Sequence, residues 1–339
     1  MKNLSLLFVL AVILCGSACE TDFQLEGEWE DIPVVYAFLS EQDTAYYVRV
    51  EKAFLQPGGD ATQLAQIPDS IYYGVDDVVV ALERVTNGQK YTLQRVDGRT
   101  EGYPREEGNF ANEPNYLYKL PRSVTRLRGG DQFRIIVDRG GQTAPAIAES
   151  TIIDSIEVAG LPFSGQLGWG EYARDGKIEW RYYGPGARVF DLRVKFRYRE
   201  TDPANPAIRI DKEVTWVLNK SVERVTDQVS TQVYRFPSEA FYQFIGSTLE
   251  PLNTGTRKFD AVVIEVTAAG PEIEDYLRIA GANIGITSSQ AIPLYTNVTG
   301  GVGVVSSRYK SVSAELSLDG RSRDSLFNGS YTKLLNFVP

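Results

Sequence analysis

The stretch VFDLRVKFRYR, residues 189–199, alternates between apolar and polar side chains over its whole length. Successive side chains of a β-strand point to opposite faces of the sheet. One face of this stretch holds Phe190, Leu192, Val194, Phe196 and Tyr198, and the opposite face holds Asp191, Arg193, Lys195, Arg197 and Arg199. The pattern predicts a strand with one buried and one solvated face. After the connection Thr201–Ala207, residues Ile208–Leu218 repeat the pattern, which predicts an antiparallel partner.

Shorter alternating stretches occur on both sides of this pair. They are Asp77–Val85, Lys90–Val96, Gln132–Asp138 and Lys258–Thr267. Asn87-Gly88 between the first two is a strong hairpin signal. The predicted fold is therefore mainly β. We expect an Ig-like β-sandwich over residues 33–150, followed by a second β-rich domain over residues 151–339 with a few short helices. The composition changes around Thr143–Asp154, which favours a boundary there.

Helix signals are few in this sequence. Asp60 and Gln63 have the spacing of a capping box at the start of a short helix. In the second domain, Ser238 is suited to cap a helix over residues 239–249. Pro271 is suited to begin a helix over residues 271–280, with acidic residues favourably placed in its first turn.

The composition excludes several classes of function. The chain has 339 residues, a net charge of −9 and no histidine. Without histidine there is no Ser-His-Asp triad, no imidazole base and no histidine-ligated zinc or haem. The net negative charge also argues against a nucleic-acid surface, which needs clustered basic charge. We therefore expect a protein that is not an enzyme, holds no metal or cofactor, and binds no nucleic acid.

The N-terminus has the features of an export signal. Lys2 precedes the apolar run Leu4–Leu14, which is too short for a membrane-spanning helix and suits a cleaved signal peptide. Gly16-Ser17-Ala18-Cys19 then resembles the bacterial lipobox, with Gly16 at the position where Leu is usual. We predict a lipoprotein signal peptide over residues 1–18 and acylation of Cys19. The alternative is an ordinary signal peptide that leaves Cys19 as a free thiol.

Cysteine usage agrees with acylation. Cys15 and Cys19 are the two cysteines, and Cys15 is the poorer acylation candidate because Leu14 precedes it. Acylation of Cys19 would leave an exported protein without a free thiol, in an oxidising compartment. A multiply acylated cysteine anchors a protein durably. We expect an anchor in the outer membrane, followed by an acidic tether over residues 19–32, and leave open which side of the membrane the protein faces.

Two clusters are candidates for a partner or ligand surface. The aromatic cluster comprises Trp169, Tyr172, Trp180 and Tyr183, and exposed aromatic rings pack on proteins or stack on sugars. The alternative places these rings in the core. The basic stripe comprises Arg193, Lys195, Arg197 and Arg199, which could bind a carboxylate, a phosphate or an acidic partner. The alternative is a solvated strand face with cross-strand partners such as Glu213.

Two further functions remain open at this stage. Glu171, Asp175 and Glu179 lie in the aromatic segment, and paired carboxylates about 5–10 Å apart hydrolyse glycosides without histidine. The sequence thus allows a carboxylate-based surface glycan or peptide hydrolase. It also allows a structural or adhesive spacer of the cell envelope. Asp175-Gly176 is also a favourable turn sequence, so the carboxylates alone do not distinguish a hydrolase from a non-catalytic protein.

Four stretches of the chain after the signal carry a resemblance to known sequences. They are Ile32–Leu39, Tyr47–Phe54, Pro68–Tyr73 and Tyr295–Gly303, the last continuing into Ser306–Tyr309. On these stretches, most of the chain after the signal resembles a family of uncharacterised lipoproteins from Bacteroidetes-type bacteria. The resemblance implies an outer-membrane location. Some relatives lie beside TonB-dependent receptors, which implies an accessory role in uptake or surface assembly with a protein partner in the envelope. The resemblance transfers no catalytic residues to this chain.

Overall fold

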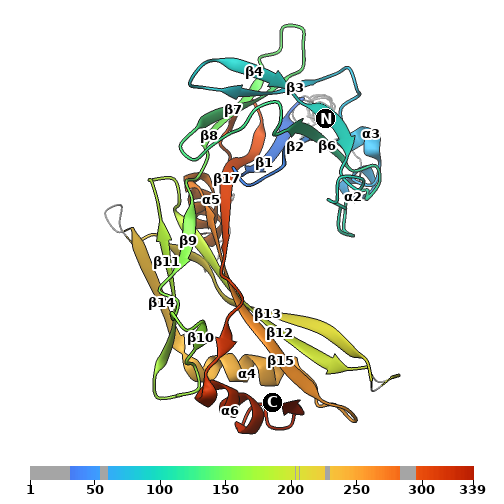
Figure 1. Cartoon of the computed structure of the whole chain (residues 1–339). Coiled ribbons are helices and arrows are strands. Elements are labelled where there is room, and N and C mark those ends of the chain that lie inside the picture. The colour runs from blue at the N-terminus through green and yellow to red at the C-terminus, as the bar shows by residue number, and fades with distance from the viewer. Residues whose placement is uncertain (1–30, 54–59, 203, 206, 226–229, 283–294) are drawn as a thin grey trace, which may run out of the picture.

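Alternating strands build two β-sandwiches that follow one another along a curved body (Figure 1). The structure, a computed structural model, describes residues 31–53, 60–202, 204–205, 207–225, 230–282 and 295–339. The signal peptide, Cys19 and all but the end of the tether lie outside these residues. The fold is mainly β with a few short helices, as the sequence predicts.

The first sandwich packs two antiparallel sheets around an apolar core. One sheet contains β1 (Pro33–Leu39), β2 (Ala45–Lys52), β5 (Gln94–Asp97) and β6 (Tyr116–Pro121). The other contains β3 (Val79–Arg84), β4 (Gln89–Thr92), β7 (Gln132–Asp138), β8 (Ala146–Thr151) and β16 (Val298–Thr299). Every second side chain of β7 is buried, as its alternation predicts. The short helices α2 (Ala61–Leu64) and α3 (Pro68–Ile71) join β2 to β3, and Asp60 caps α2.

The second sandwich is built on the longest strands of the chain. One sheet contains β12 (Val189–Thr201), β13 (Arg209–Glu223), β15 (Arg257–Ala269) and β19 (Phe337–Val338). The opposing strands are β9 (Ile156–Ala159), β11 (Asp175–Tyr182) and β14 (Thr231–Pro237), and β10 (Gln166–Leu167) pairs with β18 (Ser317–Leu318). Three helices belong to this half: α4 (Ser238–Thr248), α5 (Pro271–Ala282) and α6 (Gly320–Asn328).

Strand β17 (Val302–Val312) belongs to both sandwiches. Its first half pairs in parallel with β1, from Val302 to Ser307, and its second half pairs antiparallel with β15. The two main sheets are thereby joined into one nine-stranded sheet. Residues 298–305 therefore pack into the first core, although the sequence analysis assigned all of 151–339 to the second domain. Ile152 is the last residue of the first core before the chain enters the second core at Ile153.

Two local predictions differ from the structure. The stretch Lys90–Val96 is not one strand, because the chain crosses between the sheets at Leu93: β4 pairs with β3, whereas β5 pairs with β6. Ser238 does not cap α4, because it is the first residue of the helix and is itself buried. The helix itself is present as predicted, but its N-cap is Pro237, and no side-chain hydrogen bond caps its first turn.

Gly303 offers a test of the shared strand. Its φ is +126°, and an added Cβ would lie 2.0 Å from the carbonyl oxygen of Val35 on β1. We expect Gly303→Ala to lower the free energy of unfolding by about 3 kcal/mol or more, because both the backbone conformation and the close approach of β1 exclude a side chain. Urea unfolding followed by circular dichroism measures this change.

Gly281 in α5 is the matched control. Nothing lies within 4 Å of its Cβ position, and helix propensity favours alanine there by about 1 kcal/mol. Gly281→Ala is therefore expected to be neutral or slightly stabilising. Equal losses in the two variants would contradict the role given to Gly303.

Candidate functional site

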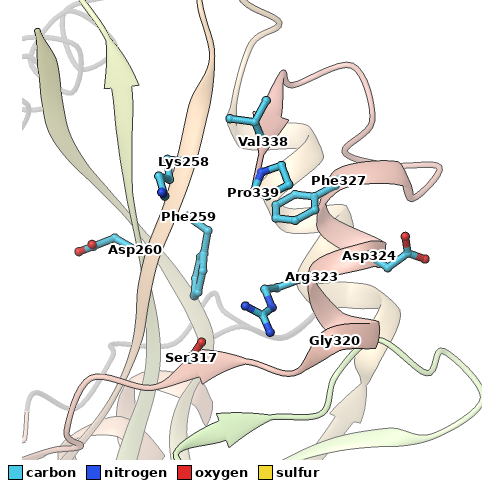
Figure 2. A pocket seen from close by; sticks show the side chains of 10 residues that line it. All are labelled: Lys258, Phe259, Asp260, Ser317, Gly320, Arg323, Asp324, Phe327, Val338 and Pro339. Atoms are coloured by element: carbon cyan, nitrogen blue, oxygen red, sulfur yellow. The ribbon is translucent and has the colours of Figure 1, made fainter. Parts of the chain in front are cut away.

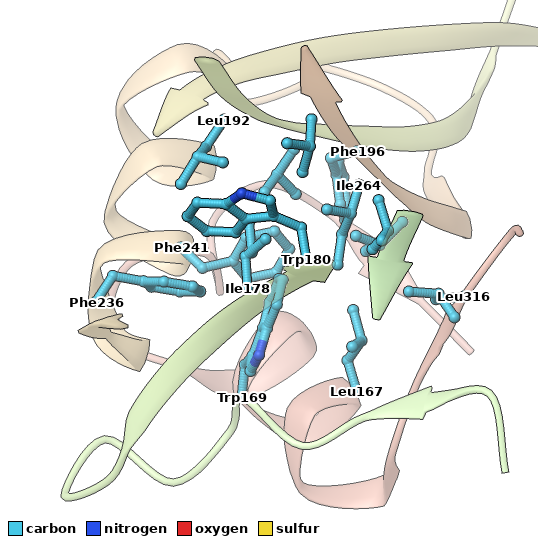
Figure 3. Close-up of a cluster of buried hydrophobic side chains, with 14 of the residues drawn as sticks. Leu167, Trp169, Ile178, Trp180, Leu192, Phe196, Phe236, Phe241, Ile264 and Leu316 are labelled. Carbon is cyan, nitrogen blue, oxygen red and sulfur yellow. The ribbon is translucent and has the colours of Figure 1, made fainter. Parts of the chain in front are cut away.

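The structure places the two tryptophans of the aromatic cluster in the second core. Trp180 has no exposed surface and Trp169 is 4% exposed. The Trp169 ring contacts Phe236 and Phe241 edge to face, with centroids 5.2 and 5.1 Å away. Figure 3 shows both indoles inside the buried cluster. The prediction that Trp169 and Trp180 form a partner surface is wrong, and the core alternative is correct.

The two tyrosines of the cluster are separated by this arrangement. Tyr172 is half-buried and packs against the rings of Tyr242 and Tyr331. Tyr183 is 45% exposed just after β11. An aromatic docking surface built from these four residues is therefore not formed, and Tyr183 alone stays available to solvent.

The basic stripe exists, but acidic neighbours neutralise most of it. Arg193, Lys195, Arg197 and Arg199 share the solvent face of β12, and Arg197 lies directly opposite Glu213 on β13. The ion pairs of this face are Lys195 with Glu213 (3.3 Å) and Glu265 (3.0 Å), Arg197 with Glu213 (2.8 Å) and Glu315 (2.8 Å), and Arg199 with Asp260 (3.0 Å). The alternative with Glu213 as cross-strand partner is confirmed, and only Arg193 lacks an ion pair with a described residue.

Glu265 is the most buried member of this network. Its residue is 5% exposed, and its carboxylate lies between the ammonium groups of Lys195 and Lys310, at 3.0 and 2.9 Å. Burial raises the pKa of Glu265, but the hydrogen bonds from Lys310 and Lys195 outweigh burial, so the pKa lies below its ordinary value of 4.5. The ion pairs of this face thus join four neighbouring strands, β13, β12, β15 and β17, and favour their register.

The three carboxylates of the hydrolase alternative do not face one another. Asp175 and Glu179 line a pocket of about 310 Å³ on β11. Four residues apart on one strand, their Cα atoms are about 13 Å apart. Lys177 lies between them on the same face, with its Nζ 3.1 Å from Glu179. Glu171 is directed elsewhere, to Arg174 and Arg321. This arrangement lacks the close carboxylate pair that glycoside hydrolysis uses.

A larger cavity lies outside the candidate sites predicted from the sequence. It has a volume of about 500 Å³ and lies between β15 and α6, beside the end of β19 (Figure 2). Phe259 and Phe327 contribute aromatic walls, and Lys258, Arg323 and Ser317 contribute polar groups. The one sequence signal for it is the spacing of Gly320, Arg323, Asp324 and Phe327, which places these four residues on one face of a helix.

Comparison with known proteins assigns this chain to no family. No family model matches the sequence, and no curated protein matches it. Among solved structures, the chain is similar to the chicken CNTN1 FN1–FN3 domains, with 11% identity, a TM-score of 0.23, and coverage of 70% of this chain and 60% of that one. It is also similar to the chicken interferon gamma receptor alpha chain, with 10% identity, a TM-score of 0.18, and coverage of 70% and 88%.

A third similarity is to the C-terminal globular domain of an oligosaccharyltransferase from Pyrococcus abyssi, with 8% identity, a TM-score of 0.21, and coverage of 86% of this chain and 50% of that one. Within the described part of the chain, no helix has the length and apolar character needed to cross a membrane. In the same part, no group of acidic, histidine or cysteine side chains has the geometry of a metal site.

The buried carboxylate of Glu265 gives a pH-dependent prediction. Because the pKa of Glu265 is lowered on folding, its contribution to stability is present above about pH 4.5 and is lost as the pH falls through the folded value. We expect Glu265→Gln to be less stable than the wild type at pH 7, with the difference shrinking below pH 4.5. Urea unfolding across this pH range measures it.

Glu315→Gln is the control for this experiment. Its side chain is 67% exposed and pairs with Arg197 at the surface, where an ion pair contributes about 1 kcal/mol or less. Its removal is expected to change stability little at any pH. A Glu265→Gln variant with the same pH profile as the wild type would contradict the assignment.

Proposed function

We propose that the protein is an outer-membrane lipoprotein, anchored through Cys19, that acts as a non-catalytic binding or assembly accessory of an envelope complex. A TonB-dependent receptor is the proposed partner. The lipobox-like Gly16–Cys19 and the sequence resemblance support the anchor and the partner class. The geometry around Asp175 and Glu179 favours this function over hydrolysis.

The main support for this proposal is the position of the two domains relative to the proposed anchor. The tether leads into β1 of the first domain, whereas the second sandwich extends to the opposite end of the molecule (Figure 1). An acyl group at Cys19 would therefore attach at the first-domain end. The hairpin β12–β13 and the cavity beside α6 would then be displayed away from the lipid, where a partner or ligand can reach them.

The exposed edge of β13 supports contact with a partner. In the described chain β13 is the last strand of the nine-stranded sheet, and it runs for 15 residues. Ile210 and Val217 on this strand are 39% and 42% exposed. An edge strand presents unpaired backbone groups to which another strand can add. A structural spacer would not require an exposed edge strand. This feature therefore favours the function of a binding or assembly accessory over that of a spacer.

Acylation is tested by replacing the proposed lipidated residue. We expect Cys19→Ser to abolish incorporation of labelled palmitate and to release the protein from the membrane fraction, because the acyl chains supply the membrane affinity. Cys15→Ser is the matched control and should keep both the label and the location. Palmitate labelling unchanged in Cys19→Ser would refute the anchor.

The partner is tested by crosslinking from the proposed edge. A photo-reactive residue at Val217 is expected to capture an outer-membrane receptor, identified by mass spectrometry, in intact cells. The control carries the photo-reactive residue at Val79 in the first domain, where the native side chain is 52% exposed. This control should not capture the receptor. Receptor capture from Val79 alone, or no receptor from either position, would count against partner binding at β13.

A further inference from the structure

Helix α6 presents one face to the core and a different face to the cavity. Ser322 and Leu326 are buried, and the Ser322 hydroxyl donates to the Leu167 carbonyl while accepting from the Trp169 N–H. Asp319 caps the helix through the N–H of Ser322. These contacts hold the helix, and with it Arg323 and Phe327, in place beside the cavity.

Two phenylalanine rings form the apolar walls of the cavity. Phe259 on β15 and Phe327 on α6 are both partly buried against the second core. The Phe259 ring packs on Phe196, with 5.6 Å between centroids. Their remaining surface borders the cavity, and the Arg323 guanidinium lies near both rings (Figure 2). Rings fixed in this way offer flat apolar surfaces at little entropic cost.

The charges of the cavity favour an anion. Neither Arg323 nor Lys258 makes an ion pair or side-chain hydrogen bond with another described residue. The two acidic groups are occupied: Asp260 pairs with Arg199 at 3.0 Å, and Asp324 accepts from Asn328 at 2.7 Å. Both carboxylates also point away from the cavity in Figure 2. Lys258 is paired in register with Arg199 of the solvent face, whereas its neighbour Phe259 is on the cavity side. Arg323 is thus the cation left to face a ligand, with Ser317 in the same lining.

We propose that this cavity binds a small organic carboxylate attached to a flat apolar ring. The planar guanidinium of Arg323 matches a carboxylate with two parallel hydrogen bonds. Phe259 and Phe327 would contact the ring. A volume of about 500 Å³ is within the range of small-molecule sites. Nothing in this assignment depends on membrane anchoring.

The test uses three probes with the purified chain, by isothermal titration calorimetry. 3-Phenylpropionate carries both features, 3-phenylpropan-1-ol lacks the charge, and propionate lacks the ring. We expect saturable binding of 3-phenylpropionate, tighter than that of either other probe. Arg323→Gln should lower the affinity for 3-phenylpropionate at least about tenfold, as expected for a lost charge-assisted hydrogen bond. The same substitution should leave the affinity for the alcohol unchanged.

Arg321→Gln provides the matched protein control. Arg321 lies two residues away on the same helix and pairs with Glu171 outside the cavity, so its loss should leave all three affinities unchanged. No saturable binding of 3-phenylpropionate by the wild type would overturn the proposal. Equal losses in Arg321→Gln and Arg323→Gln, or alcohol bound as tightly as carboxylate, would do the same. Because the measurement needs no lipid, such a failure would leave the anchoring proposal untouched.

Discussion

Strand β17 supplies backbone hydrogen bonds to both sandwiches, and the placement of one domain against the other depends on this sharing. A strand cannot bend sharply between Ser307 and Arg308 without losing ladder bonds on one side or the other. Side chains reinforce the junction. The Ser307 hydroxyl accepts from the Ile153 N–H at 2.7 Å, and Arg308 pairs with Asp43 at 2.9 Å. The two domains are consequently joined by sheet structure and not by a flexible linker.

The shared sheet also explains where the charged residues lie. Alternation along β17 places Lys310 on the solvent face, where it meets Glu265 and, through it, Lys195. A register shift of one residue would bury these charges and expose the aromatic side of β12, so the network specifies a single register. At the far end of β12, the nearly buried Glu200 is held by Arg257 at 2.9 Å. Charge in this domain therefore serves mainly to align strands.

The sequence was informative wherever local periodicity decides the outcome. The alternation in β12 and β7 identified both strands and their buried faces, and Asn87-Gly88 identified a hairpin turn. Trp180 shows how residue type misleads: it alternates with its neighbours as a core residue should, yet an aromatic-rich segment suggested a surface. Trp169 lies outside any strand, and its burial depends on Phe241 of α4, about 70 residues later. A local sequence pattern does not indicate a contact between residues so far apart in the chain.

The shared strand and the cavity were beyond sequence reasoning for the same reason. Which strands β17 joins depends on contacts with β1 and β15, distant in the chain, and the cavity exists only because α6 meets Phe259. An arginine without an ion pair to any described residue is notable in the lining of this cavity, because the chain has a net charge of −9. At physiological salt, exposed charges are screened beyond about 8 Å, so the acidic surface scarcely opposes an anion already inside. Recognition there is governed by the groups that line the cavity, and among those Arg323 faces the cavity without an ion pair to any described residue.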